Sequence, residues 1–166
     1  MSDKTYNVLF ICTGNSARSI MAEGLMNHLG GGRFRAHSAG SHPKSEVHPL
    51  ALQTLENLHM GMPPMGYRSK SWEEFATPDA PPLGFVFTVC DKGAGEACPL
   101  WPGQPMTAHW GVPDPAAVTG PPEQQRKAFL DSAVILKRRI ELMLSLPLSR
   151  LDAIAIQREI KDIGQK

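Results

Sequence analysis

Apolar residues along this 166-residue chain alternate between short continuous runs, typical of buried strands, and longer runs with helical spacing. The strand-like segments are 6–11, 35–37, 83–89 and 106–110. The helix-like segments are 21–29, 48–59, 71–75, 121–147 and 149–166. Strands that alternate with helices are typical of a parallel sheet covered by helices, so we expect an α/β fold with about four strands and an extra C-terminal helix.

Turn-forming residues mark the ends of these segments. Gly30, Gly31 and Gly32 end the first helix, and Pro147 ends the long one. Ser149 and Asp152 have the spacing of a capping box for the last helix. The length suits one domain, which we place at residues 1–147, with a helical tail at 148–166.

The charge balance and the N-terminus narrow the choice of partner and compartment. With 17 basic and 16 acidic residues, the net charge of +1 offers no field for nucleic acid or an anionic membrane. The first residues lack the basic region and long apolar core of a signal peptide, so we expect a cytoplasmic protein. In that reducing compartment its three cysteines are expected to be reactive thiols.

Residues 12–19, Cys-Thr-Gly-Asn-Ser-Ala-Arg-Ser, follow the first apolar run directly and lead into the first helix. We call this stretch the anion loop. A strand, a tight loop and a helix N-terminus direct backbone N–H groups at one point, where Arg18 adds positive charge and a tetrahedral oxyanion fits. The residues predicted to bind this anion are Thr13, Gly14, Asn15, Ser16, Ala17, Arg18 and Ser19.

Cys12 stands at the entrance of the anion loop. The same partial positive charges lower the pKa of a thiol, so we expect a thiolate nucleophile at neutral pH. Gly14 and Asn15 can adopt a positive φ, and Ser16 or Ser19 can donate to the thiolate. The alternative is a buried cysteine at a strand end beside an unrelated surface arginine, which leaves the Gly-Asn-Ser sequence unexplained.

Cys90 and Cys98 extend the possible thiol chemistry. Cys90 ends the apolar run 83–89, and ligands of open α/β sheets bind beyond the carboxyl ends of the strands, so Cys12 and Cys90 can be neighbours. Cys98 lies in a segment rich in glycine and proline, which we expect to be mobile and long enough to reach Cys90. The alternative is an inert core thiol and an incidental loop cysteine. No paired-ligand spacing predicts a metal site.

Asp114, between Pro113 and Pro115, is a candidate general acid. A carboxyl group close to a bound dianion is held protonated by like-charge repulsion and can protonate a departing oxygen. Taken without the other groups, an aspartate in an ordinary turn is the simpler interpretation.

With these residues assembled, the chain resembles the low-molecular-weight protein tyrosine phosphatase superfamily and, within it, the arsenate reductases of that fold, from about Tyr6 to Met143. The motifs that carry the resemblance are the anion loop, Met21-Ala22-Glu23-Gly24, Ser38-Ala39-Gly40, the segment from Cys90 to Pro99, and His109-Trp110-Gly111 leading to Asp114-Pro115. The resemblance implies the following roles: Cys12 as nucleophile, Arg18 as oxyanion clamp, Asn15 and Ser19 as supporting residues, and Asp114 as general acid.

For an arsenate reductase the resemblance implies a relay through Cys12, Cys90 and Cys98, because reducing arsenate takes two electrons, which thiols supply by forming a disulfide. It implies no tightly bound cofactor, phosphate as a competing anion, and thioredoxin or glutathione with glutaredoxin as the reductant. Ala116 and Ala117 stand where many of the phosphatases carry tyrosines, and Ala17 stands where many relatives carry a cysteine. A phosphomonoester phosphatase and a non-enzymatic oxyanion or redox sensor remain as alternatives.

Overall fold

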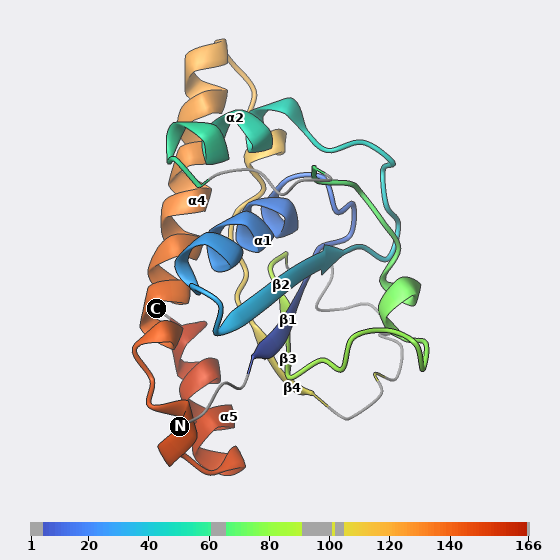
Figure 1. The fold of residues 1–166 in the computed structure, drawn as a ribbon. Helices are drawn as coiled ribbons and strands as arrows, with labels where there is room; N and C mark the ends of the chain where they lie inside the picture. The colour runs from blue at the N-terminus through green and yellow to red at the C-terminus, as the bar shows by residue number, and fades with distance from the viewer. Residues whose placement is uncertain (1–4, 61–65, 91–100, 102–104, 166) are drawn as a thin grey trace.

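The computed structural model describes residues 5–60, 66–90, 101 and 105–165, and its centre is a parallel sheet (Figure 1). The strands in sheet order are β2 (Phe34–Ala39), β1 (Tyr6–Ile11), β3 (Phe85–Thr88) and β4 (Met106–His109). Ile11 pairs with Ala39 on one side and with Thr88 on the other, so the carboxyl ends of these strands meet at one edge. The predicted parallel sheet of about four strands is confirmed.

Alternation along β1 divides the core into two layers. Val8 and Phe10 face a large cluster formed with the helices, whereas Leu9 and Ile11 face a smaller cluster with Trp72. The helices are α1 (Arg18–Leu29), α2 (Pro49–Asn57), α4 (Pro122–Leu144) and α5 (Ala153–Ile163), with short 3₁₀ turns η1 (Trp72–Phe75), η2 (Pro115–Ala117) and η3 (Leu148–Arg150). Figure 1 shows α4 and α5 on one side of the sheet and η1 on the other.

Two helix starts differ from the sequence prediction. The first helix begins at Arg18 rather than Met21, so Arg18 belongs to its first turn. The capping box at Ser149 is wrong, because Ser149 lies in η3 and Asp152 is itself the N-cap of α5. The Asp152 carboxylate accepts a hydrogen bond from Ala155 N at 2.8 Å.

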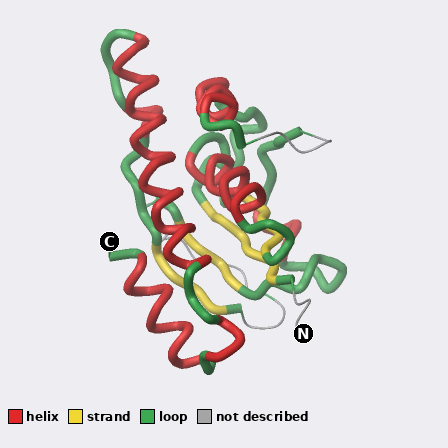
Figure 2. The backbone as a smooth tube through the Cα atoms, turned by 60° about the vertical axis from the view of Figure 1, so that its left-hand side comes forward, coloured by secondary structure: helices red, strands yellow, loops and turns green. Residues whose placement is uncertain are grey.

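The C-terminal helix α5 turns back beside α4 and covers the outer strand (Figure 2). Its residues Ile156, Ile160 and Ile163 are buried in the same cluster as the helices of the main domain. Trp110 Nε1 donates to the Ile160 carbonyl at 2.9 Å, which fixes α5 against the chain that follows β4. In the described part of the chain, no helix has the length and apolar character needed to cross a membrane.

Candidate active site

The anion loop lies at the carboxyl edge of the sheet, between β1 and α1. Cys12 N donates to the Ala39 carbonyl at 3.2 Å, so the end of β2 runs directly beside the start of the loop. A Cβ atom on Gly40 would lie 2.5 Å from the Thr13 oxygen and 2.6 Å from the Cys12 oxygen, both backbone atoms. Glycine is therefore required at position 40 to let the two segments approach.

The carbonyl groups of the loop point outward. Three of them accept backbone hydrogen bonds from the segment 42–48: Thr13 O from His42 N at 2.9 Å, Gly14 O from Lys44 N at 3.0 Å, and Ser16 O from His48 N at 2.8 Å. In a planar trans peptide the following N–H points the opposite way. The amide N–H groups of Gly14, Asn15 and Ala17 are therefore directed to the inner side of the loop, as an anion site requires.

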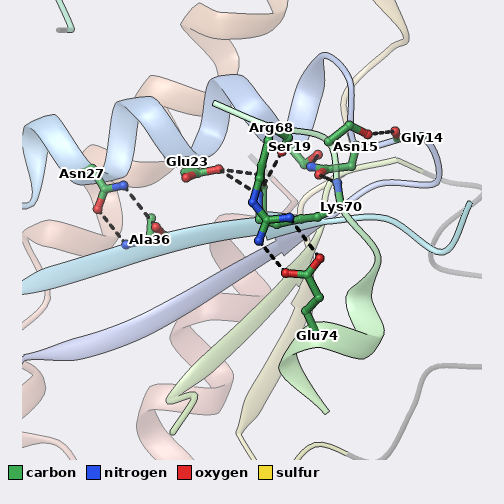
Figure 3. A network of polar contacts seen from close by, with 11 residues as sticks. Gly14, Asn15, Ser19, Glu23, Asn27, Ala36, Arg68, Lys70 and Glu74 are labelled. Atoms are coloured by element: carbon green, nitrogen blue, oxygen red, sulfur yellow. Dashed lines mark hydrogen bonds and ion pairs between the residues drawn. The ribbon is translucent and has the colours of Figure 1, made fainter. Parts of the chain in front are cut away.

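Asn15 holds the turn of the loop from inside. It has a φ of 45° and is fully buried. Its Nδ2 donates to Ser19 Oγ at 2.8 Å, and its Oδ1 accepts from Lys70 N at 2.8 Å (Figure 3). Of the two residues expected to be able to adopt a positive φ, Asn15 does so and Gly14 does not.

A buried ion pair supports the loop from behind. Lys70 Nζ lies 3.9 Å from Glu23 Oε1, which also accepts a hydrogen bond from Ser38 Oγ at 2.5 Å (Figure 3). Burial raises the pKa of Glu23 and lowers the pKa of Lys70, while each charge opposes the shift of the other. Removing one partner would leave a buried charge uncompensated beside the loop.

A cavity of about 300 Å³ opens over the loop. It is lined by Cys12, Thr13, Gly14, Ser16, Ala17, Arg18, His42, Lys44, Asp114 and Ala116. Arg18 Nη1 donates to the Val112 carbonyl at 3.0 Å, and Nη2 lies 3.7 Å from Asp114 Oδ2. The structure thus brings Asp114 together with Cys12 and Arg18 of the anion loop, from which it is far away in the sequence.

Cys90 joins this group from the neighbouring strand. It follows β3 as Cys12 follows β1, and the two cysteines are 1% and 5% exposed. Thr13 N donates to Cys90 Sγ at 3.3 Å, and Thr13 Oγ1 lies 3.7 Å from the same sulfur. Both cysteines are free thiols in this arrangement.

The protonation of Cys12 differs from the expectation. A hydrogen bond with the Cys90 side chain and burial raise the pKa of Cys12, whereas the Arg18 charge and the Gly14 amide act to lower it. In this ligand-free arrangement the thiolate is not the favoured form, and the predicted thiolate at neutral pH is wrong for it. The neighbouring Cys90 side chain is therefore one cause, with burial, of the raised Cys12 pKa.

Comparison with known proteins decides the family. Residues 7–141 match the family model described as low molecular weight phosphotyrosine protein phosphatase. The chain belongs to this family. An arsenate reductase of Bacillus licheniformis is 32% identical over 130 residues, which cover 78% of this chain and 86% of that protein.

Two solved structures relate this member of the phosphatase family to arsenate reductases. One is an arsenate reductase in a phosphate-binding state, with a TM-score of 0.63 and 29% identity, covering 85% of this chain and 98% of that one. The other is a thioredoxin-dependent arsenate reductase from Corynebacterium glutamicum, with a TM-score of 0.55 and 28% identity, covering 86% of this chain and 65% of that one. Helix α5 lies beyond the residues that match the phosphatase family model.

Three residues near the site of this phosphatase-family chain were missed by the sequence reasoning. His42 and Lys44 line the cavity, and Lys70 contacts Asn15 and Glu23. Their contacts join segments distant in sequence, so no local spacing pointed to them. Cys98 and the rest of the loop expected after Cys90 lie outside the described residues. Within the described ranges, no group of three or more His, Cys, Asp or Glu residues could hold a metal ion.

Proposed function

We propose that this protein reduces arsenate to arsenite with Cys12 as nucleophile and Cys90 as the second thiol. The observation that carries the proposal is the placement of a second buried cysteine just beyond the end of β3, beside the anion loop, where its sulfur accepts a hydrogen bond from Thr13 N. Phosphate ester hydrolysis does not consume a second thiol, whereas arsenate reduction requires an electron pair that two thiols supply.

In the first step the N–H groups of the anion loop and Arg18 hold the oxygens of arsenate, and phosphate competes for the same groups. Cys12 first releases its thiol proton to solvent, and the thiolate sulfur then attacks the arsenic atom and forms a sulfur–arsenic bond. One hydroxyl group of arsenate takes a proton from Asp114, the bond between its oxygen and arsenic breaks, and it departs as water. Asp114 lies at the mouth of the cavity, with its side chain 43% exposed, where it can exchange that proton with solvent.

In the second step the Cys90 thiolate attacks the Cys12 sulfur. A Cys12–Cys90 disulfide forms, the sulfur–arsenic bond breaks, and its electron pair leaves with arsenic as arsenite. Cys98 then attacks Cys90, which produces a Cys90–Cys98 disulfide and returns Cys12 as a thiolate. The balance is two thiols oxidised to one disulfide for each arsenate reduced.

An external thiol donor completes the cycle by reducing the Cys90–Cys98 disulfide. We propose thioredoxin for this role, with glutathione and glutaredoxin as the alternative donor system, and no tightly bound cofactor. The thioredoxin-dependent relative with 28% identity supports this choice. The reaction is placed in the cytoplasm, where thiols are kept reduced.

A second candidate function is phosphomonoester hydrolysis. The anion loop, Arg18 and Asp114 serve both chemistries, and the family model that matches the chain is that of a phosphatase. Ala116 lines the cavity where many phosphatases carry an aromatic side chain. The side chain that could pack against a phosphotyrosine ring is therefore small here.

The test compares single cysteine variants under multiple turnover with thioredoxin, thioredoxin reductase and NADPH. We expect Cys90→Ser and Cys98→Ser to lose arsenate turnover while they keep any hydrolysis of an aryl phosphate. Cys12→Ser is expected to lose both activities. Full arsenate turnover by Cys90→Ser would falsify the relay, and rapid aryl phosphate hydrolysis without arsenate turnover in the parent protein would favour the phosphatase.

A further inference from the structure

Lys44 crosses the anion loop at Gly14. Its N–H donates to the Gly14 carbonyl at 3.0 Å, so its backbone position is tied to the loop. A Cβ atom on Gly14 would lie 3.1 Å from Lys44 Cε, 3.2 Å from Cγ and 3.3 Å from Cδ. The stem of Lys44 therefore passes across the space that a side chain at position 14 would occupy.

This contact explains why residue 14 is a glycine. Gly14 has a negative φ, so its backbone conformation is open to any residue. A side chain there would press on the Lys44 stem at distances tighter than most Cβ contacts. The absent side chain therefore provides room for Lys44 across the loop.

The charge of Lys44 is available to a ligand. Lys44 is exposed, lines the same cavity as Cys12 and Arg18, and forms no ion pair with any residue that the structure describes. Arg18 is partly engaged, because it donates to the Val112 carbonyl and faces Asp114. Among the residues that the structure describes, a dianion in the cavity would thus meet Arg18, which already has partners, and Lys44, which has no ion-pair partner.

The charges of Lys44 and Asp114 both act on His48, whose N–H donates to the Ser16 carbonyl of the anion loop. Its pKa is lowered by burial and by the Lys44 charge, and it is raised in turn by the Asp114 charge. Lys44 and Asp114 therefore both act on one ring at the edge of the cavity. A positive charge at this position also offsets the repulsion between Asp114 and an incoming anion.

We propose that the Lys44 ammonium group is a second cationic contact for the bound oxyanion, and that Gly14 is required to seat it. The ligand class is a free inorganic tetrahedral oxyanion, phosphate or arsenate. This inference depends on the proposed function only where it names arsenate as the anion that reacts. Lys44 determines the affinity for the anion, and the thiol chemistry belongs to the cysteines.

The experiment measures phosphate binding to the reduced full-length protein by isothermal titration calorimetry, which requires no turnover. Lys44→Met keeps an unbranched apolar side chain and removes the charge, and it is expected to weaken phosphate binding about tenfold or more. Lys44→Arg keeps the charge and is expected to stay within about threefold of the parent protein. Lys127→Met, which removes an exposed lysine of α4 paired with Asp131, is the control and is expected to bind as the parent.

A second readout separates a charge contact from a structural role. Phosphate affinity of the parent should fall steeply with added salt, and this dependence should be weaker in Lys44→Met. A double-mutant cycle tests whether Gly14 leaves room for the Lys44 side chain. Gly14→Ala should weaken phosphate binding in the parent protein, and the same substitution should have a smaller effect in the Lys44→Ala background. Parent-like binding by Lys44→Met, an equal loss in Lys44→Arg, or additive effects in the cycle would overturn the proposal.

These outcomes are independent of the relay. If the parent protein fails to turn over arsenate and Lys44→Met still weakens phosphate binding, the proposed function falls and the second cationic contact stands. If arsenate turnover depends on Cys90 and Lys44→Met binds phosphate as the parent does, the proposed function stands and the role of Lys44 falls.

Discussion

Cys12 and Cys90 form a coupled pair of buried thiols, and the chemistry of one depends on the place of the other. The hydrogen bond with Cys90 is the largest cause that raises the pKa of Cys12. When Cys90 moves away or becomes oxidised, Arg18 and the Gly14 amide remain as the groups that favour the thiolate. Burial raises the pKa as well, so the balance between burial and these two groups sets the protonation of Cys12 once the Cys90 hydrogen bond is lost.

Replacing Cys90 with alanine tests this coupling. We expect the pKa of Cys12 to fall in Cys90→Ala, because the main cause of its rise is removed. The pH midpoint for alkylation of Cys12 by iodoacetamide should move to lower pH. Mass analysis of the peptide that contains Cys12 measures the extent of alkylation at each pH. Val86→Ala, which creates a cavity in the same strand away from Cys12, is the control. An unchanged midpoint in Cys90→Ala would show that burial dominates the pKa.

At the level of single residues, the sequence indicated the reactive groups but not their supports. Cys12, Arg18 and Asp114 have side chains whose chemistry points to a site, and the structure gathers them at one cavity. Lys70 and Lys44 act through contacts with backbone and side-chain atoms of the loop, across many residues of sequence. Those contacts follow from the folded path of the chain, which a local motif does not encode.

At the level of elements, the apolar pattern predicted the strands and helices well, because β1 and β3 are buried on both faces as continuous apolar runs and α4 and α5 each bury one face. Their ends were less predictable. Whether Ser149 or Asp152 caps α5 depends on where η3 turns the chain, and that turn is set by packing. The parallel order of the strands followed from the alternation of strand and helix, since a parallel connection needs a crossover.

Helix α5 is an element whose contribution can be measured with two isoleucines of the same helix. Ile160 is fully buried, and its carbonyl accepts the Trp110 hydrogen bond, whereas Ile154 is 73% exposed. Ile160→Ala should lower the free energy of unfolding by about 2–4 kcal/mol, because it leaves a cavity in the core. Ile154→Ala should change it by less than about 0.5 kcal/mol. Chemical denaturation measures both.

One outcome would contradict the predicted difference between Ile160→Ala and Ile154→Ala. An equally small effect in both variants would mean that α5 is only loosely attached to the domain. Because Trp110 leads to Asp114 along the chain, a large effect in Ile160→Ala would also tie the tail to the segment that carries the proposed general acid.

At the level of the whole molecule, positive charges gather around the carboxyl edge of the sheet although the net charge is only +1. Arg18, Lys44 and Lys70 all contact or line the anion loop. Lys70 also affects His37 in β2, whose pKa is lowered to about 4 by burial first and then by the charges of Lys70 and Arg35. The Lys70 backbone N–H contacts the loop, and its ammonium charge helps to lower the pKa of His37.

His37 makes the stability of the fold depend on pH between its native pKa of about 4 and its ordinary value of 6.5. In this window the unfolded chain binds the proton and the native protein does not, so stability is present above pH 6.5 and is lost as the pH falls. His37→Gln removes this titrating group. The free energy of unfolding that is lost between pH 6.5 and pH 4 should therefore be smaller by about 1–2 kcal/mol than in the parent, a value discounted for partial exposure of the ring. The free energy of unfolding, measured by denaturation at several pH values, tests this, with the exposed His28→Gln as control.

The raised pKa of Glu23 acts with the opposite sign but is present in all three proteins, so it cancels in the comparison. Parallel pH profiles for the parent and His37→Gln would contradict a role for His37.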